Sequence, residues 1–510
     1  MSLRVADLAA VLMYALVVLG LGIWSRGRIK GTEGFFVGGR AIPGWAVGIS
    51  MMGTAISSIT FLAYSGSAYA GNWSRLVPSL TLPIAAAVAG YLLVVFYRRT
   101  LFVSAFQYFE RRFGNWGRSY TSLVWSLASI NRMGAILYLM ALPMQLMTGW
   151  SVATVMIAAG LLITVYTIMG GLEAVIWTDV LQTIVLALGG LLTVALVLAR
   201  VPGGFEEVVG MASSAGKFEF SVSFDFNFVR DTFWVLMLNG LIVNMQGYAT
   251  DQTNIQRYAA AKSDRSALGA IWTMGLGCIP IWLLFGFVGS CIWVFYQVNP
   301  DPQVAALRAD TVYPHFMMTQ MPPFIGGLVL SALLAAAMSS IDSSMNGTAT
   351  VLTVDFYQRH FVKGKDDSHY LQVARIITAA LGVLMVLVAY GLWHLGAGSI
   401  LDTLMFVASV IGGGIGGLFF LGFLTNRVSA KAAAAGLVMG ILAIIWCTLS
   451  RFGIVQEPFA FNVHPFMIIV VGNVVVFAAG LIASAFFPAP KQDEIVGMTW
   501  WTREQTGASV

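Results

Sequence analysis

The chain has 510 residues, of which 58% are hydrophobic and only 10% are charged, and its mean hydropathy is +0.81. Soluble domains carry about 25% charged residues, so this composition excludes a soluble protein and indicates one that uses lipid as its solvent. The formal net charge of +5 does not indicate nucleic-acid binding, because the basic residues form short clusters between apolar segments, as topology signals do.

Runs of about 20 apolar residues are long enough to cross a bilayer as helices. The first run, 7–25, is followed by three basic residues and not by a small-residue cleavage site, so we expect an uncleaved helix, with a signal peptide as the minor alternative. The sequence predicts an all-α membrane protein with about thirteen transmembrane helices, near 7–25, 45–70, 76–96, 119–148, 152–168, 175–200, 233–255, 267–296, 324–355, 371–394, 400–424, 431–450 and 464–487.

Lysine and arginine concentrate in every second connection between these helices, near residues 26–30, 98–118, 257–265, 359–365 and 427–431. Positively charged loops stay on the cytoplasmic side of a membrane. We therefore expect a multi-pass protein of the plasma (inner) membrane with its N-terminus outside and its C-terminus in the cytoplasm. The three cysteines all lie in apolar runs and are interpreted as small buried hydrophobes, with no disulfide framework and no metal site.

A polar island interrupts the predicted helix 45–70, where Gly53 is followed by Thr54, Ser57, Ser58 and Thr60. Glycine and closely spaced hydroxyls weaken a helix, so an unwound stretch here would expose backbone carbonyls to a cation and helix ends to a solute. The alternative is that the hydroxyls only bond to the preceding turn and pack helices closely. A second island, from Asn239 to Tyr248 in the predicted helix 233–255, has the same two interpretations.

The most polar island lies inside the predicted helix 324–355 and contains Ser339, Ser340, Asp342, Ser343 and Ser344. An aspartate at the bilayer centre costs roughly 2.5–3.5 kcal/mol, so it indicates a functional site with a partner to be found. At helical spacing Ser339 shares a face with Asp342 and Ser343. Hard oxygen ligands on one face suit a small hard cation.

Arg132 is the only basic residue that the predicted helices bury. A guanidinium is always charged and binds carboxylates with two parallel hydrogen bonds, so Arg132 must face an acidic side chain or an anionic solute. The best protein candidate is Asp179, which could instead cap the start of the predicted helix 175–200. A structural pair between Arg132 and Asp179 therefore remains open.

The sequence gives no support for an enzyme. Its five histidines are scattered without the spacing of a metal site, and neither the glycine pair at 170–171 nor the three glycines at 412–414 form a phosphate-binding loop.

Four motifs resemble the sodium/solute symporter family, which includes bacterial sodium–galactose and sodium–sialic acid transporters and mammalian glucose, monocarboxylate, vitamin and iodide carriers. They are the segments 57–61, 170–182, 251–258 and 339–344, of which 170–182 (GGLEAVIWTDVLQ) is the most specific. The resemblance implies a helical transporter core of two inverted five-helix repeats with broken helices and alternating access. Its expected parts are an N-terminal helix and cytoplasmic loop at 1–44, a first repeat at 45–200, an external loop at 201–232, a second repeat at 233–424, and two C-terminal helices with a cytoplasmic tail at 425–510.

The resemblance also implies two cation sites. The first sodium ion would be bound by residues of the broken helix and of the helix 324–355, namely Gly53, Ile56, Ala336, Ser339 and Ser340. A second sodium site, as in the sialic-acid-type members, would use Ser339 with Asp179, Asp342 and Ser343. This chain departs from that branch because Asp342 stands where the branch has a serine. Two neighbouring carboxylates would bind a cation more tightly or share a proton, so the second sodium and proton participation both remain open.

For the solute, the resemblance to the sialic-acid type implies a carboxylate-binding set of Ser57, Ser58, Thr60 and Arg132. The sugar transporters of the family have a glutamine where Thr60 stands and an acidic residue where Ser79 stands, so the departures at both positions favour an anionic solute over a neutral hexose. The opposite wall of the solute site is expected to be formed by Asn244, Gln246 and Tyr248.

We therefore expect a sodium-coupled secondary active symporter that imports a small polar organic solute, an anionic one such as a sialic acid, a sugar acid or a monocarboxylate. The alternative is a sodium-coupled neutral sugar or vitamin symporter, and a more remote one is a transporter-fold sensor, for which the short C-terminal tail is expected to leave no room for a signalling domain. The expected partners are the solute, the sodium ion and the bilayer, without nucleic acid. The oligomeric state remains open, with a monomer as one expectation.

Overall fold

The computed structural model describes residues 4–29, 31–58, 60–395 and 410–502. In this part of the chain the secondary structure is helical apart from two isolated β-bridges, between Ile42 and Ala261 and between Ser223 and Thr232. The elements are α1 (Val5–Arg26), α2 (Gly31–Val37), η1 (Gly38–Arg40), α3 (Gly44–Ala55), η2 (Thr60–Tyr64), α4 (Ser65–Ala70), η3 (Trp73–Thr81), α5 (Leu82–Ala89), η4 (Gly90–Val94), α6 (Val95–Thr100), α7 (Gln107–Phe113), α8 (Asn115–Thr148), α9 (Val152–Arg200), α10 (Gly204–Ser214), α11 (Phe233–Thr250), α12 (Gln252–Ala260), α13 (Asp264–Val298), η5 (Val304–Ala306), α14 (Ala309–Gln320), α15 (Ile325–Val351), η6 (Leu352–Phe361), α16 (Asp367–Leu395), α18 (Ile415–Leu424), α19 (Ala430–Arg451), α20 (Pro465–Ala483) and α21 (Gln492–Ile495).

These helices account for the predicted membrane segments. Within the described residues, nine helices are long and apolar enough to cross a membrane, or ten if α3 and the bent continuation through α4 count as one span. The long helix α9 contains both predicted segments 152–168 and 175–200, while α11 and α18 correspond to two further predicted segments. The predicted segment 400–424 lies partly outside the described residues. The expected all-α membrane architecture is confirmed.

A kink at Gly171 divides α9 into two helical halves. The backbone of Gly171 has φ 50° and ψ −148°, a conformation open to glycine and costly for residues with a side chain. A Cβ atom at this position would also lie only 2.7 Å from the carbonyl oxygen of Phe35 in α2. The glycine pair of the predicted motif therefore lets the chain bend where α2 crosses it.

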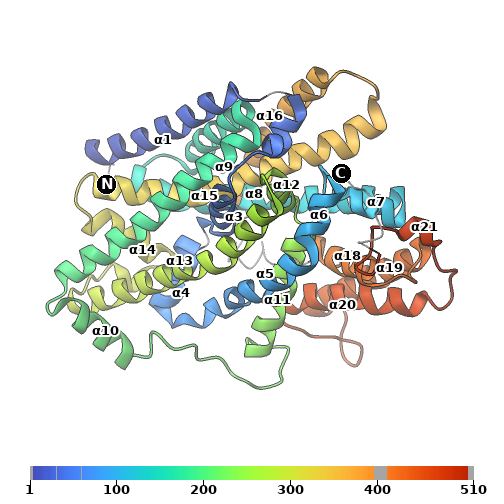
Figure 1. Ribbon diagram of the computed structural model, residues 1–510. Helices are drawn as coiled ribbons and strands as arrows, with labels where there is room; N and C mark the ends of the chain where they lie inside the picture. The colour runs from blue at the N-terminus through green and yellow to red at the C-terminus, as the bar shows by residue number, and fades with distance from the viewer. Residues whose placement is uncertain (1–3, 30, 59, 396–409, 503–510) are drawn as a thin grey trace.

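The helix α15 lies at the centre of the protein. It packs against α9 most extensively and also contacts α8, α1 and α16, and Figure 1 shows it between α1, α9 and α13, with α18, α19 and α20 gathered away from it at one side. All residues of α15 except Ile325 and Leu328 are buried. A helix with this environment meets protein on every face, so its polar side chains avoid lipid.

The first helix caps the start of α15. Asp7 of α1 accepts hydrogen bonds through Oδ1 from the backbone N–H groups of Phe324 and Gly327, each at 2.9 Å. The first N–H groups of a helix have no partner within the helix, and a carboxylate there also interacts favourably with the helix dipole. Asp7 therefore holds the N-terminus of α15 against α1.

Several contacts join connections that lie far apart in the chain. In one set, the bridge between Ile42 and Ala261 lies with the contact of Arg98 to Asp264. The other set contains the contact of Arg4 to the carbonyl of Met321 and the ion pair of Arg75 with Asp231. In these four examples from the described residues, each contact joins two connections that the charge pattern places on the same side of the membrane.

Candidate functional site

The polar island in the predicted helix 45–70 is a true helix break. The helix α3 ends at Ala55, and Ile56 follows with extended dihedral angles of φ −98° and ψ 100°. Helical structure resumes at Thr60, and the two halves are bent by 60°. The last carbonyl groups of a helix have no partner within the helix and carry the negative end of its dipole. The end of α3 therefore presents backbone oxygens that favour a cation.

These oxygens face the polar island of α15. The Ser339 Oγ lies 3.0 Å from the carbonyl oxygen of Gly53 and 3.3 Å from that of Ala336, and the Ser340 Oγ lies 3.2 Å from the carbonyl oxygen of Thr54. Hydroxyl and unwound-backbone oxygens of this kind coordinate sodium in broken-helix transporters. The predicted first cation site is thus brought together, Thr54 joins it, and Ile56 lies buried at the break.

Gly53 allows this approach. A Cβ atom at Gly53 would lie 2.7 Å from the Thr183 Oγ1 of α9, a distance that a real Cβ atom could not adopt unless the Thr183 side chain moved. The glycine therefore brings α3 close enough to α9 and α15 for its carbonyl to meet Ser339.

The second predicted cation site contains a buried ion pair that the sequence did not predict. Asp179 Oδ2 lies 2.9 Å from Nη2 of Arg257, and both side chains are fully excluded from solvent. The same guanidinium donates to hydroxyls on α3 and α15 and to a backbone carbonyl, namely Ser50 (2.8 Å), Thr54 (2.9 Å), Ser343 (2.6 Å) and the carbonyl oxygen of Thr253 (2.8 Å). Arg257 thereby ties α12 to three helices at once.

Asp342 lies in the same buried region and has different partners. Its Oδ2 accepts hydrogen bonds from the Tyr166 hydroxyl at 2.6 Å and from the Thr178 hydroxyl at 3.5 Å, and the Ser343 Oγ lies 3.4 Å from its Oδ1. The Oδ1 atom of Asp179 is buried without a hydrogen-bond partner.

When both carboxylates are ionised, Asp179, Asp342 and Arg257 together leave one net negative charge in the protein interior. Buried charge of this kind is costly unless it is compensated. A free carboxylate oxygen beside a net negative charge fits a monovalent cation, so the residues present are compatible with a second sodium ion.

Arg132 projects from the middle of α8 and is only partly satisfied by the protein. Its Nη2 donates to the Ser344 Oγ at 2.8 Å, and its Nη1 lies 3.7 Å from Asp251 Oδ2. The Nε atom is buried without a partner, yet 36% of the side chain is exposed. A guanidinium in a membrane helix that has N–H groups left to donate can bind the carboxylate of a solute.

The other predicted solute-binding residues fall into two groups. The Ser58 Oγ is buried without a partner near the helix break, and Thr60 begins the next helical segment. Further away in sequence, the Ser79 Oγ shares a hydrogen bond of 2.8 Å with the Tyr64 hydroxyl. Ser57 lies in the helix break itself, between the end of α3 and the start of η2.

The structure divides the predicted opposite wall. Asn244 donates to Thr81 at 2.9 Å, and Tyr248, one turn later on the same face of α11, has a buried hydroxyl without a partner. Gln246 turns to another face, where it donates to the carbonyl of Gly412 and accepts from Asn473. Gln246 thus lies on a different face of α11 from Asn244 and Tyr248, and the role of all three at the solute site stays a prediction.

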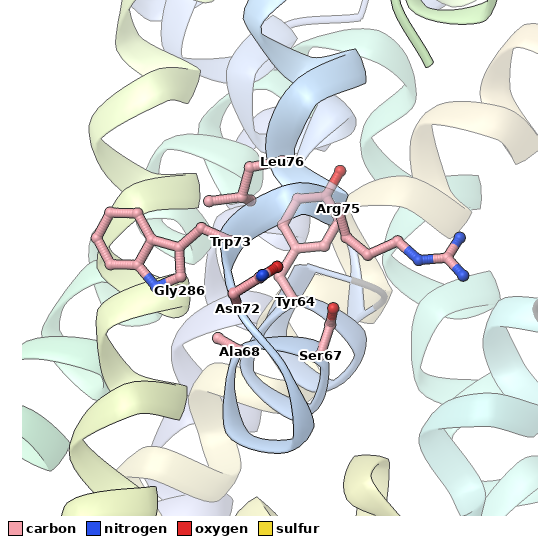
Figure 2. Close-up of a pocket in the computed structure, with 8 residues that line it drawn as sticks. All are labelled: Tyr64, Ser67, Ala68, Asn72, Trp73, Arg75, Leu76 and Gly286. Carbon is pink, nitrogen blue, oxygen red and sulfur yellow. The ribbon is translucent and has the colours of Figure 1, made fainter. Parts of the chain in front are cut away.

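A small crevice lies between α4, η3 and α13 (Figure 2). Trp73 is directed toward the helix that carries Gly286, whereas the guanidinium of Arg75 points the opposite way. The crevice spans about 150 Å³, open solvent included, which is below the ~300 Å³ of ordinary ligand pockets. It is too small to be the solute site.

The sequence matches a known family over most of its length. The profile of the sodium:solute symporter family covers residues 35–440. The chain belongs to this family. The symporter is 30% identical to the sodium/sialic acid symporter of Proteus mirabilis over 484 residues, which cover 95% of this chain and 96% of the relative. It is 28% identical to the sodium/glucose cotransporter of Vibrio parahaemolyticus, over 86% of this chain and 84% of the relative.

Solved structures agree. The symporter superposes with a TM-score of 0.87 on a sodium-coupled sialic acid symporter in a substrate-bound, outward-open state, with 29% identity and coverage of 96% and 99% of the two chains. The nucleobase-cation-symport transporter Mhp1 shares the fold, with a TM-score of 0.57 and 16% identity. The symporter therefore has the inverted-repeat transporter fold, uses sodium as its coupling ion, and is a multi-pass transporter and not an enzyme.

Arg257 is the residue of the symporter site that the sequence analysis missed. Its position in the 257–265 cluster suggested a loop, whereas it is fully buried. Arg132, the basic residue that the predicted helices were expected to bury, is only partly buried, whereas Arg112, Arg118 and Arg257, outside those helices, are buried. The alternative pair of Arg132 with Asp179 is not formed, because Asp179 pairs with Arg257. A charge balance indicates that two intramembrane carboxylates require compensating cations, but it does not say which residue supplies them.

Proposed function

We propose that this symporter imports an anionic solute of the sialic-acid type, driven by the sodium gradient. The observation that carries the proposal is the state of Arg132, whose partly exposed side chain has a hydrogen bond to Ser344, a 3.7 Å contact to Asp251 and an Nε without a partner. A solute carboxylate would supply the charge-assisted hydrogen bonds that the protein leaves unmade. The relatives named for sialic acid transport support the same solute class.

The hydroxyls beside the helix break would complete the solute site. Ser57, Ser58 and Thr60 follow the end of α3 directly, so the segment that presents carbonyls to a cation also presents hydroxyls to a solute. Sodium at Gly53, Ile56, Ala336, Ser339 and Ser340 would join α3 to α15 and hold this segment in place. Occupancy of the first cation site would thereby favour solute binding, which is the thermodynamic requirement of coupling.

A second sodium ion would be bound by Asp179, Asp342 and Ser343. The free Oδ1 of Asp179 and the net negative charge of the buried group support this assignment. We assign the two inverted repeats to residues 45–200 and 233–424. We also place the loop set that contains residues 98 and 264 in the cytoplasm, because it is the more basic one. The N-terminus is then outside and the C-terminus inside.

Uptake into proteoliposomes tests the function. With sodium outside and potassium inside, radiolabelled sialic acid should accumulate above its external concentration, and it should not do so when sodium is replaced by choline. Unlabelled monocarboxylates, glucose and a carboxylate-bearing vitamin serve as competitors. No uptake of sialic acid together with sodium-driven accumulation of radiolabelled glucose would overturn the anionic proposal in favour of the neutral-sugar alternative.

A further inference from the structure

The motif at residues 251–258 meets both sites described so far, through Asp251 beside Arg132 and through Arg257 beside Asp179. It forms the short helix α12, preceded by Asp251 as its N-cap, and every residue of α12 is buried. The helix is held firmly, because Gln252 bonds to the backbone at Val103 and Ala105, and Gln256 bonds to Thr350 of α15. The N-cap residue Asp251 faces Arg132 of the solute site, whereas Arg257 within the helix faces the second cation site.

A continuous chain of contacts runs along this helix. Asp251 Oδ2 lies 3.7 Å from Nη1 of Arg132, while Asp251 Oδ1 accepts hydrogen bonds from the N–H and the hydroxyl of Thr253 at 2.8 and 2.5 Å. The carbonyl of Thr253 accepts from Arg257. Arg257 then contacts Asp179 and Ser343 at the second cation site.

The helix α15 closes the loop from the other side. Arg132 donates to Ser344, and Arg257 donates to the neighbouring Ser343. Two adjacent hydroxyls of one rigid helix are therefore bound by the arginine of the solute site and by the arginine of the cation site. A change of partner at Arg132 acts on α12 and α15 together.

We propose that Asp251 is a positioning residue that serves as an internal counter-ion of Arg132, and that a solute carboxylate displaces it. Displacement frees the Asp251 carboxylate from Arg132 and so changes its hydrogen bonds to Thr253 at the start of α12. Because the carbonyl of Thr253 accepts from Arg257, the geometry at Asp179 and Ser343 changes with it. Asp251 thereby sets the affinity for anionic solutes and links it to the second cation site. The inference rests on the proposed anionic solute and names the residue that couples it to sodium.

The test is the variant Asp251→Asn. Asparagine is as good an N-cap as aspartate, so α12 keeps its cap while the negative charge beside Arg132 is lost. Binding of sialic acid and of its uncharged methyl ester is measured by calorimetry on the full-length purified protein, with and without sodium. Sialic acid should bind about two- to fivefold more tightly, the size expected for an ion pair of this exposure, and the affinity for the ester should not change. The factor by which sodium improves sialic acid binding should decrease.

The matched control is Asp231→Asn, which removes a carboxylate 3.5 Å from Arg75, away from both sites, and should alter none of these values. Equal shifts for the acid and the ester, or no shift, would overturn the inference, since a purely structural cap would affect both ligands alike. An unchanged sodium factor would overturn the link to Arg257. If the wild-type protein binds neither ligand but does bind glucose, the proposed function fails as well, which separates the two failures.

Discussion

Nη2 of Arg257 lies 2.9 Å from Oδ2 of Asp179, and both side chains are completely shielded from solvent. Breaking a buried pair by removing one partner costs more than the pair itself contributes, because an uncompensated charge stays behind. This pair therefore joins the stability of the protein to the charge of its cation site.

The first prediction concerns this pair. Arg257→Met should destabilise the protein by about 3–5 kcal/mol, and the double variant Arg257→Met/Asp179→Asn should recover part of the loss, because no unpaired carboxylate remains. Thermal unfolding in detergent measures both. Sodium should stabilise the single variant more than the wild type, since it can neutralise Asp179 there. If sodium stabilises the two proteins equally, Asp179 does not face the cation path.

The second prediction concerns the first cation site. Ser339→Ala and Ser340→Ala each remove an oxygen that lies within 3.3 Å of a backbone carbonyl at this site. The sodium concentration for half-maximal transport should rise about tenfold or more, given the ~1.5–3 kcal/mol of a hydrogen bond to a charged group. Ser331→Ala, which changes a buried hydroxyl on the same helix that donates to the carbonyl of Gly327, is the control. Unchanged sodium dependence in both site variants would remove these serines from the site.

The third prediction tests Arg132. Arg132→Lys keeps the charge but loses the planar pair of donors, so sialic acid binding should weaken about tenfold or more. Arg28→Lys, at a half-exposed arginine paired with Glu173, should have no effect. A lysine variant that binds the solute normally would show that Arg132 serves only Asp251 and Ser344.

The fourth prediction concerns Asp342. Replacing it with serine removes one buried negative charge and leaves Asp179 balanced by Arg257, so transport should continue with less charge moved per solute molecule. Asp342→Leu leaves Tyr166 without its acceptor and should abolish coupling. Electrogenic currents measured together with solute uptake give the charge ratio. Equal ratios in the wild type and Asp342→Ser would make Asp342 a structural residue outside the ion path.

The fifth prediction is a pH dependence outside the membrane-spanning helices. The hydrogen bond from His464, at 3.1 Å, and the charge of Arg75 hold the pKa of Asp231 below its ordinary value. A depressed carboxyl pKa stabilises the folded state above the pKa of the unfolded chain, about 3.9, and this contribution is lost as the pH falls through the folded value. Asp231→Asn should therefore unfold at a lower temperature than the wild type at pH 7, and the difference should shrink below pH 4. A constant difference across this range would contradict the assignment.

Much of the fold could be predicted because a membrane-spanning helix requires a run of about 20 apolar residues, which is visible in the sequence. The broken helix at Gly53 was predictable for a related reason, since glycine and hydroxyls in a membrane helix need partners that only protein or water can supply. The first cation site stays a prediction: the adjacent hydroxyls of Ser339 and Ser340 in an apolar helix indicate a cation, and the resemblance to the family supplied the rest of its ligand set.

The position of Arg257 could not be predicted from local sequence. It stands seven residues before the next long helix, α13, close to Lys262 and Arg265, and looks like a topology signal. Arg257 reaches Asp179 only because α12 packs against α3 and α15 in the folded protein. In the same way, the spacing of Asn244, Gln246 and Tyr248 shows which residues share a face but not which face meets the solute.

The contact of Asp7 with the start of α15 joins residues 317 positions apart in the chain. During synthesis the residues of α1 (Val5–Arg26) are made long before those of α15 (Ile325–Val351), whose N-terminus Asp7 caps. Until then the N–H groups of Phe324 and Gly327, which Asp7 binds in the folded protein, do not exist. The N-terminus of α15 can therefore be capped only late in synthesis. A chain that lacks α1 should still insert its remaining helices into the membrane but should not reach the folded state.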